Sequence, residues 1–258
     1  MLAIDQGTSG TKAIVLDPVD GVIAAAEVPI RPSYLPGGGV EQDPAQLLAS
    51  VLDAGRQALV LAGRPVHTVS LANQGESVLV WDRSTGRPLT PVLVWQDSRA
   101  SAVCHELQEH RSDIARRTGL VLDPYFSAPK MAWLRRERTT EGVVTTTDTW
   151  LIHQLCGEFV TDVSTASPSM ATDLDNPTWD PGLLELFALE RETLPRIVSC
   201  DENVGSTGAF GPTMTVGGLI VDQPAALLAQ RCWDRGAAKA NTPYRPDGSK
   251  HLPGVDRR

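Results

Sequence analysis

The alternation of apolar runs and turn residues at the start of the chain predicts three consecutive strands. The apolar runs cover residues 2–4, 13–16 and 22–30. Asp17-Pro18-Val19-Asp20-Gly21 separates the last two, and this composition is typical of a turn between paired strands. A loop rich in proline and glycine is expected at residues 33–39. The pattern therefore predicts an antiparallel meander followed by a loop.

Asp43 and Pro44 mark the start of a helix, because an aspartate caps free N–H groups and a proline fits the first turn. Leucine and valine then recur at helical spacing. A strand is predicted for residues 66–72, and a hairpin for residues 77–81 with 92–95. Strands interrupted by a helix in this way indicate an α/β protein with a mixed sheet flanked by helices.

The rest of the chain is mainly helical in pattern. Helices are expected at residues 100–110, 112–118, 128–138, 148–155 and 183–188. A strand at residues 216–221 and a helix at residues 223–231 follow. Beyond residue 242 prolines and charges occur without apolar periodicity. We therefore expect one domain at residues 1–239 and a divergent, disordered tail at residues 240–258.

Composition narrows the range of partners. The chain has 258 residues and a net charge of -8, so no basic face is expected for a nucleic acid or an anionic membrane. No apolar run approaches the length of a membrane span. The four cysteines lie far apart and form no Cys-x-x-Cys pair. We expect reduced thiols, mostly small core residues, in a cytoplasmic protein without zinc.

The segment from Asp5 to Lys12 has the residue types of a phosphate-binding turn. Gly7 lets backbone N–H groups approach an anion, and Thr8, Ser9 and Thr11 add hydroxyl groups. Lys12 adds a positive charge, and Asp5 suits a hydrated Mg²⁺. The segment lacks the spacing of a Walker A loop. A tight hairpin turn with no ligand is the alternative.

Polar residues also follow the apolar runs at several later points. Asn73-Gln74-Gly75-Glu76, Trp95-Gln96-Asp97 and Asp222-Gln223 each stand where a predicted strand ends. Ligands of open α/β sheets bind beyond the carboxyl ends of the strands, so we expect one shared cleft. Asp222 also stands where a helix begins, and a simple capping role is its alternative. Asp97 and Arg99 are expected to form a structural ion pair nearby.

Taken together, these segments resemble the N-terminal half of the FGGY carbohydrate kinases, most closely the glycerol kinase branch. The resemblance runs from residue 2 to about residue 239. It rests on the order and spacing of several blocks. These are Asp5-Gln6-Gly7-Thr8, Val40-Glu41-Gln42-Asp43-Pro44, Asn73-Gln74-Gly75-Glu76, Val94-Trp95-Gln96-Asp97-Ser98-Arg99, Thr118-Gly119-Leu120, Asp123-Pro124-Tyr125-Phe126-Ser127, Asp148-Thr149-Trp150-Leu151 and Asp222-Gln223-Pro224-Ala225-Ala226.

The resemblance implies an actin-like, ribonuclease-H-like fold, of which this chain forms one lobe, with ATP bound between two lobes. It implies that Asp222 is the catalytic base that takes a proton from a primary hydroxyl as that oxygen attacks the γ-phosphate. Asp5 would hold Mg²⁺ through water. Gly7, Thr8, Ser9 and Lys12 would meet the phosphates. The pocket for a polyol or sugar would be lined by Gly75, Glu76, Trp95, Tyr125 and Gln223.

Two departures from the family pattern change the expectation about the substrate. Glycerol kinases carry an arginine at the position of Gly75, so we expect a larger pocket and a four- or five-carbon polyol or ketose as an alternative to glycerol. Lys12 also stands where the family usually has an arginine. The lysine keeps the positive charge but lacks the planar guanidinium that binds two oxygens at once.

The resemblance also stops near Lys239, before the phosphate loop and second lobe of the family. We therefore expect a chain truncated before that lobe, from a prematurely ended or frameshifted gene. A non-catalytic polyol-binding remnant, half of a split kinase, and a homodimer are the alternatives that the sequence leaves open.

Overall fold

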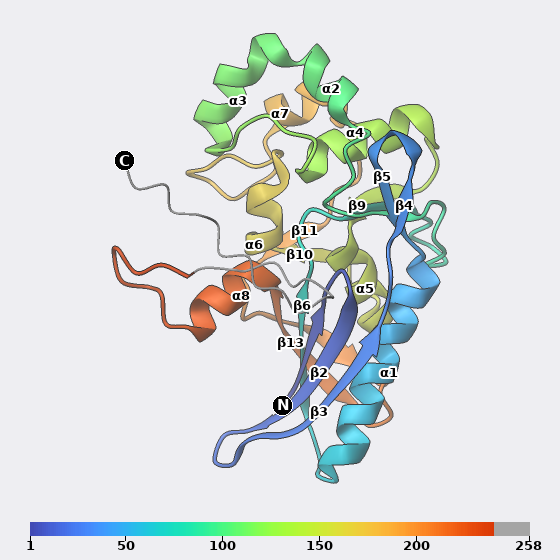
Figure 1. Cartoon of the computed structure of the whole chain (residues 1–258), viewed down its shortest axis with the longest axis vertical. Helices are drawn as coiled ribbons and strands as arrows, with labels where there is room; N and C mark the ends of the chain where they lie inside the picture. The colour runs from blue at the N-terminus through green and yellow to red at the C-terminus, as the bar shows by residue number, and fades with distance from the viewer. Residues whose placement is uncertain (240–258) are drawn as a thin grey trace. The chain divides into compact units, whose positions relative to one another are not determined.

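The computed structural model describes residues 1–239, and the predicted tail at residues 240–258 lies outside the described residues. The chain divides into one compact unit, Met1–Asp222, and a second unit that starts at Gln223. Figure 1 gives the arrangement of the elements within the first unit.

A six-stranded mixed sheet forms one half of the first unit. Its strands stand in the order β12-β13-β6-β1-β2-β3. β1, β2 and β3 pair antiparallel, which confirms the predicted meander, whereas β1, β6 and β13 are parallel. The bounds are Leu2–Gln6 for β1, Gly10–Asp17 for β2, Gly21–Pro29 for β3, Thr68–Asn73 for β6, Asn203–Thr207 for β12 and Met214–Val221 for β13.

Helix α1, Pro44–Ala62, covers one face of this sheet along β2 and β3 (Figure 1). It begins as predicted, because the Asp43 carboxylate accepts a hydrogen bond of 2.8 Å from the Ala45 N–H. Leu47 and Val51 of α1 pack with Leu2 and other apolar residues of the sheet in one core. Burial of this helix face stabilises the unit through the hydrophobic effect.

The two faces of β1 differ in burial. Leu2 and Ile4 are buried in the core under α1. On the opposite face Ala3 is half-buried and Asp5 is exposed. Alternate side chains of a strand point to opposite faces, so this pattern follows directly from the pleat. The face that carries Asp5 is therefore the accessible one, and it is where a ligand of β1 would lie.

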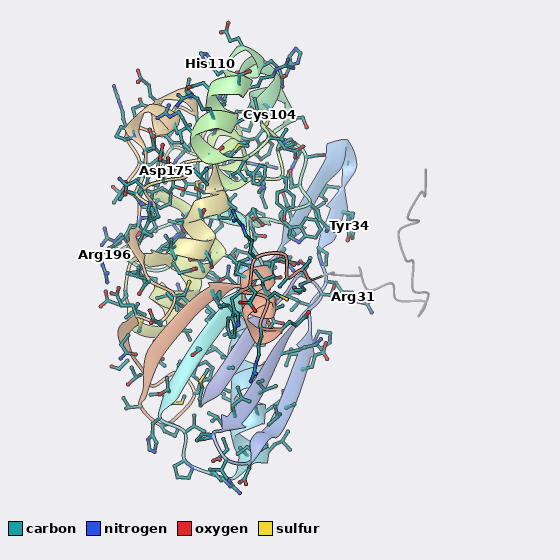
Figure 2. All side chains as sticks on the ribbon, turned by 90° about the vertical axis from the view of Figure 1, so that its left-hand side faces the viewer. Arg31, Tyr34, Cys104, His110, Asp175 and Arg196 are labelled. Carbon is teal, nitrogen blue, oxygen red and sulfur yellow. The ribbon has the colours of Figure 1, made fainter. Side chains whose placement is uncertain are left out.

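A five-stranded sheet forms the other half of the unit, in the order β4-β5-β8-β7-β9. The predicted hairpin is present, but β7 and β8 share only the Val78–Leu93 pair, because β8 is two residues long. The loop predicted at residues 33–39 is wrong: the segment forms β4, which pairs with β5, followed by a short 3-10 turn, Pro36–Gly38. Tyr34 of β4 lies exposed at this edge (Figure 2). The bounds are Ser33–Leu35 for β4, Gly39–Gln42 for β5, Val78–Trp81 for β7, Val92–Leu93 for β8 and Val143–Thr146 for β9.

Helices cover this second sheet and enclose a second core. The expected helix at residues 100–110 is divided, since the chain leaves helical geometry at Leu107. Trp150 on α5 is buried in the core. The bounds are Ser101–Glu106 for α2, Gln108–His110 for the 3-10 turn η2, Arg111–Thr118 for α3, Ser127–Glu137 for α4, Thr147–Cys156 for α5, Val163–Ala166 for α6, Ser167–Ser169 for the 3-10 turn η3 and Pro181–Leu186 for α7.

Two short parallel strands, β10 (Val160–Asp162) and β11 (Arg196–Val198), complete the first unit and have no counterpart in the sequence prediction. All four cysteines are free thiols, but only Cys104 is buried, so the expectation of mostly core cysteines is wrong. No helix within residues 1–239 combines the length and the apolarity that crossing a bilayer requires.

Candidate functional site

The ends of three parallel strands bring the predicted site residues to one edge of the six-stranded sheet. Gln6 of β1 is in register with Asn73 of β6, and Asn73 is in register with Val221 of β13. Asp222 follows Val221 and opens α8, Asp222–Ala229. Neighbouring strands are about 5 Å apart, so β1 and β13 stand about 10 Å apart with β6 between them. Asp5 and Asp222 therefore flank the segment that leads from β6 to Glu76.

The turn after β1 is closed by a hydrogen bond of 3.0 Å from the Gly7 N–H to the Gly10 carbonyl. A Cβ at Gly7 would lie 3.3 Å from that carbonyl oxygen, so the turn favours glycine there. Asp5 and Lys12 are directly opposite in the β1–β2 pair, and both side chains are exposed. Dense surroundings raise the pKa of the Asp5 carboxyl, and the Lys12 ammonium opposes that shift.

The hydroxyl groups of this turn do not all face outward. Ser9 is exposed, whereas Thr11 is buried and its hydroxyl lies 2.7 Å from that of Ser50 on α1. The predicted phosphate contact of Thr11 is therefore wrong, because β2 turns this side chain into the core. Thr8 donates its hydroxyl hydrogen to Gln74 Oε1 at 2.9 Å. Its hydroxyl is thus already engaged inside the unit.

Thr8 belongs to a polar network that joins both halves of the unit. Trp95 Nε1 donates to Thr8 Oγ1 at 2.9 Å. Gln74 Nε2 donates to Gln42 Oε1 at 2.8 Å, and Gln42 Nε2 donates to the Thr8 carbonyl at 2.8 Å. Gln42 and Gln74 are almost fully buried. Because each partner is satisfied, the network fixes the turn after β1 relative to Trp95.

Glu76 lies at the end of the β6 segment in an unusual setting. Its backbone has φ 55°, the left-handed region that side chains other than glycine rarely adopt. Burial raises the pKa of its carboxyl to about 7; Lys130 and a hydrogen bond from Tyr125 oppose this shift, and Asp222 adds to it. The electrostatic effect of Asp222 indicates that both carboxyl groups face a common region.

Tyr125 connects Glu76 with Trp95. The rings of Tyr125 and Trp95 meet edge to face with centroids 5.7 Å apart, and Phe126 contacts the other side of Tyr125 at 5.1 Å. Burial and the neighbouring carboxylate of Glu76 raise the pKa of the Tyr125 hydroxyl, so it stays a hydrogen-bond donor. The four predicted residues Glu76, Trp95, Tyr125 and Asp222 are thus linked by contacts and charge effects.

Lys130 on α4 is part of the same group, and the sequence prediction missed it. Its side chain is fully buried, and its ammonium interacts electrostatically with the carboxyl groups of Glu76 and Asp97. Lysine is rarely buried, so a single lysine within a helical pattern gives no signal of this role. The position of Lys130 just after the Tyr125-Phe126 pair is the one indication that the sequence offers.

Gly75 and Val221 meet between β6 and β13. A Cβ at Gly75 would lie 3.1 Å from Val221 Cγ1, so any side chain at position 75 requires Val221 to move. The space beside the Gly75 backbone is therefore partly filled by Val221. The absence of an arginine side chain at position 75 therefore does not leave the space next to the Gly75 main chain fully open.

The predicted ion pair is confirmed. Arg99 Nη2 lies 2.6 Å from Asp97 Oδ2, and the same nitrogen lies 2.8 Å from Glu41 Oε1. Asp97 Oδ2 also accepts a hydrogen bond of 2.8 Å from the Val40 N–H. These contacts hold the segment after Trp95 against β5, so the pair acts structurally.

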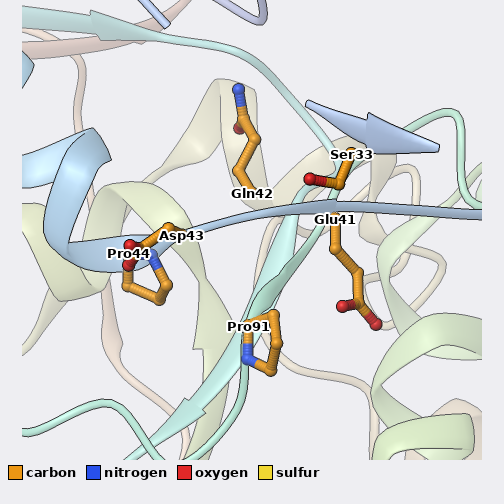
Figure 3. Close-up of a pocket in the computed structure, with 6 residues that line it drawn as sticks. All are labelled: Ser33, Glu41, Gln42, Asp43, Pro44 and Pro91. Atoms are coloured by element: carbon orange, nitrogen blue, oxygen red, sulfur yellow. The ribbon is translucent and has the colours of Figure 1, made fainter. Parts of the chain in front are cut away.

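A separate pocket of about 270 Å³ lies where β5 enters α1 (Figure 3). The side chains of Glu41 and Gln42 point to opposite sides of the strand there. Glu41 is engaged by Arg99, and none of the predicted site residues lines this pocket. The lining residues are Ser33, Glu41, Gln42, Asp43, Pro44 and Pro91.

A metal ion at the turn would depend mainly on ligands from outside the chain. Within residues 1–239 no group of three His, Cys, Asp or Glu side chains is arranged to hold one. A single exposed carboxylate, Asp5, fits a hydrated Mg²⁺, which takes few carboxylates and completes its shell with water and phosphate oxygens.

The comparisons with known proteins agree with this arrangement. The N-terminal domain of the FGGY family of carbohydrate kinases matches residues 1–226. The chain belongs to this family. The mixed sheet flanked by helices is one lobe of its actin-like fold, as the resemblance implied. The match ends at residue 226, so the predicted domain boundary at residue 239 stays a prediction.

Among curated relatives, glycerol kinase of Rhizobium rhizogenes is 38% identical over 257 residues, which are 93% of this chain and 52% of the relative. Glycerol kinase of Thermus brockianus is 40% identical over 256 residues, with the same coverage of 93% and 52%. The chain thus spans about half the length of the curated relatives that it matches.

Solved structures give the same picture. Plasmodium falciparum glycerol kinase with ADP superposes with a TM-score of 0.86 at 28% identity, covering 92% of this chain and 51% of that one. Xylulose kinase of Rhodospirillum rubrum gives a TM-score of 0.85 at 24% identity, covering 91% and 51%. The second likeness shows the fold alone.

Gln223 is the one predicted pocket residue outside the first unit. It belongs to the second unit, where its side chain is exposed and Lys239 Nζ donates to its Oε1 at 3.4 Å. Its role in the pocket stays a prediction.

Proposed function

We propose that the protein transfers the γ-phosphoryl group of ATP to a primary hydroxyl of a polyol or sugar. This chain supplies the substrate pocket, the phosphate-binding turn and the catalytic base. The observation that supports the proposal best is the register of β1, β6 and β13. In this register the ends of β1 and β13 flank the end of β6, and a metal-bound phosphate at Asp5 and a hydroxyl at Asp222 would meet beside the segment that carries Glu76.

Asp222 acts as the general base in this proposal. It accepts the proton of the attacking hydroxyl while the oxygen attacks phosphorus in line, and the ADP oxygen leaves with the electron pair of the broken bond. Mg²⁺ supplies charge neutralisation for the phosphates when bound. Asp5 would hold it through water, and Lys12 and Ser9, both exposed, would contact the phosphates. The Thr8 backbone N–H contacts the phosphates, and Gly7, whose own N–H donates to Gly10, allows their approach because it has no Cβ.

Glu76 and Tyr125 orient the substrate. The Glu76 carboxylate accepts hydrogen bonds from hydroxyl groups, and the faces of Trp95 and Tyr125 pack against C–H groups of the carbon chain. Gln223 adds an amide. Two carboxylates face this pocket and the Lys130 ammonium is engaged with the backbone, so a neutral polyol or ketose fits better than an anionic sugar acid.

The size of the substrate depends on Gly75 and Val221. Curated relatives are named glycerol kinases. Gly75 lacks a side chain, and Val221 takes up part of the space next to it. We therefore propose a neutral substrate of three to five carbons, without an arginine contact to a hydroxyl group.

The nucleotide lobe that completes the cleft is proposed to come from the carboxyl-terminal half that the relatives carry, and a homodimer is the alternative. The cytoplasm, where ATP is available, is the proposed location.

The test measures binding of glycerol, erythritol and xylulose to this chain by calorimetry, together with phosphoryl transfer from ATP to each. We expect micromolar to millimolar binding of at least one compound. Any transfer falls by about 10²-fold or more in Asp222→Asn, because the amide cannot take up the proton. Binding without transfer would indicate a polyol-binding module that needs a second lobe. The absence of binding for all three compounds contradicts the proposed pocket.

A further inference from the structure

Lys130 is the most unusual charged residue in the first unit. It lies on α4, Ser127–Glu137, and its side chain is completely buried. A buried ammonium is costly unless it is paired and hydrogen-bonded, so the contacts of Lys130 define what it does.

The Lys130 ammonium contacts three successive backbone carbonyl groups. Nζ donates to Pro124 O at 3.0 Å and to Phe126 O at 2.9 Å, and it also donates to Tyr125 O. An ammonium has three N–H donors, so all three are used and none remains for a ligand. A neutral amine has only two N–H donors, so the three acceptors favour the charged form, although burial lowers the pKa of this side chain.

The acidic groups around Lys130 lie on several elements. Glu76, Asp97 and Asp123 all favour its positive charge, and the thiol of Cys104 faces it from α2. These groups stabilise the buried ammonium without direct ion pairs at contact distance. The role of Lys130 therefore centres on the backbone that it holds.

The segment held by Lys130 carries the ring at the centre of the pocket. Tyr125 contacts Trp95 and Phe126 with its ring and Glu76 with its hydroxyl. The Lys130 ammonium also lies 5.9 Å from the centre of the Tyr125 ring. A shift of the Tyr125 backbone would move both its ring and its hydroxyl, since the side chain has only two torsions.

We propose that Lys130 is a positioning residue for the substrate pocket, which holds Tyr125 against Glu76 and Trp95 by binding the carbonyl groups of residues 124–126. The inference rests on the proposed function, because affinity for a neutral polyol or ketose is the property that Lys130 controls. Lys130 itself makes no contact with the substrate.

A double-mutant cycle tests the proposal on this chain. Lys130→Met, Tyr125→Ala and the double variant are titrated calorimetrically with the polyol that the wild type binds best. Lys130→Met is expected to weaken binding by about tenfold in the wild-type background and by less than about twofold in the Tyr125→Ala background. Equal losses in both backgrounds would overturn the proposal, because a merely structural lysine acts without Tyr125.

Arg136→Met on the same helix is the matched control. Arg136 pairs with Glu106 at 2.7 Å on the surface of α4. Its loss removes a cation of α4 without touching residues 124–126, and the affinity for the polyol is expected to stay within about twofold of the wild type. A loss as large as that of Lys130→Met would overturn the proposed specificity of Lys130.

A measurement on the wild type keeps the proposal testable if Lys130→Met does not fold. Nitrogen-15 NMR of the lysine side chains should show one ammonium protected from solvent exchange at neutral pH, with scalar couplings to the carbonyl carbons of residues 124–126. A neutral amine, or an ammonium without those couplings, overturns the proposal. If the wild type binds no polyol while this ammonium is present, the proposed function fails and the backbone contact of Lys130 stands.

Discussion

The turn after β1 and the group around Glu76 lie at the same sheet edge but are built differently. Asp5, Ser9 and Lys12 are exposed at the turn, whereas Glu76 and Lys130 are buried. The exposed Asp5 carboxylate can share a metal with water and phosphate, and its surroundings raise its pKa with Lys12 opposing the shift. A buried carboxylate loses hydration, so its pKa rises and its hydrogen bonds to a ligand become stronger. The two regions thus suit a charged and a neutral ligand, respectively.

The largest expected difference between the regions concerns polyol affinity. Glu76→Gln replaces a charged acceptor with a neutral amide and is expected to weaken polyol binding by about 10- to 100-fold. Asp5→Asn makes the same chemical change at the turn and is expected to leave polyol affinity within about twofold of the wild type. Calorimetric titration of both variants checks this, and equal effects would contradict the separation of the two regions.

The pH dependence of binding sharpens the same comparison. The Glu76 carboxyl has its pKa raised to about 7 in a setting shared with Lys130, Tyr125 and Asp222. Its ionised form accepts the stronger hydrogen bonds, so polyol affinity should rise by about tenfold between pH 6 and pH 8. Titrations across this range check the step, which should be absent in Glu76→Gln.

Stability should follow pH in the opposite direction. The pKa of Glu76 is raised from its ordinary value of 4.5 to about 7 in the folded chain, so between these pH values the folded state binds more protons than the unfolded one. The contribution of Glu76 to the free energy of unfolding therefore falls as pH rises through this window. The free energy of unfolding, measured with denaturant between pH 4.5 and pH 7, should fall more steeply with pH for the wild type than for Glu76→Gln. The same dependence on pH in both proteins would contradict the raised pKa.

The smallest expected effect lies in the link between the two regions. Thr8→Val removes the acceptor of Trp95 Nε1 and the donor to Gln74 while it keeps the shape of the side chain. Loss of this hydrogen-bonded link should lower polyol affinity by about fivefold through Trp95. Ser9→Ala at the exposed tip of the turn is the control, and it is expected to leave polyol binding unchanged.

Local patterns predicted most of the secondary structure but failed where pairing was decided at long range. The meander and α1 follow from apolar periodicity, turn residues and the Asp43 cap. Residues 33–39 looked like a loop because Pro36 and the three glycines after it dominate the pattern, yet Ser33–Leu35 pairs with β5 at a sheet edge. β10 and β11 are short strands that lie far apart in the sequence, and nothing local marks them.

The candidate site was predictable where motifs carried it. Asp5, Glu76, Trp95 and Asp222 stood out as polar or aromatic residues after apolar runs, and Tyr125 was implied by the family resemblance. The structure links all of these except Asp5. Lys130 was missed because its role depends on burial and on three backbone carbonyls, which no residue pattern shows. Thr11 was misplaced because strand alternation, and not residue type, directs its hydroxyl toward Ser50.

The sequence by itself determined the family, the strand-turn-strand start and the residue types available for chemistry, because these depend on local order and spacing. Only the tertiary structure decided which of those residues share an environment. The parallel register of β1, β6 and β13 brings distant carboxylates to one edge, and burial there raises the pKa of the Glu76 carboxyl. Proximity and desolvation are properties of the packed chain, so they become visible only once the strands are aligned.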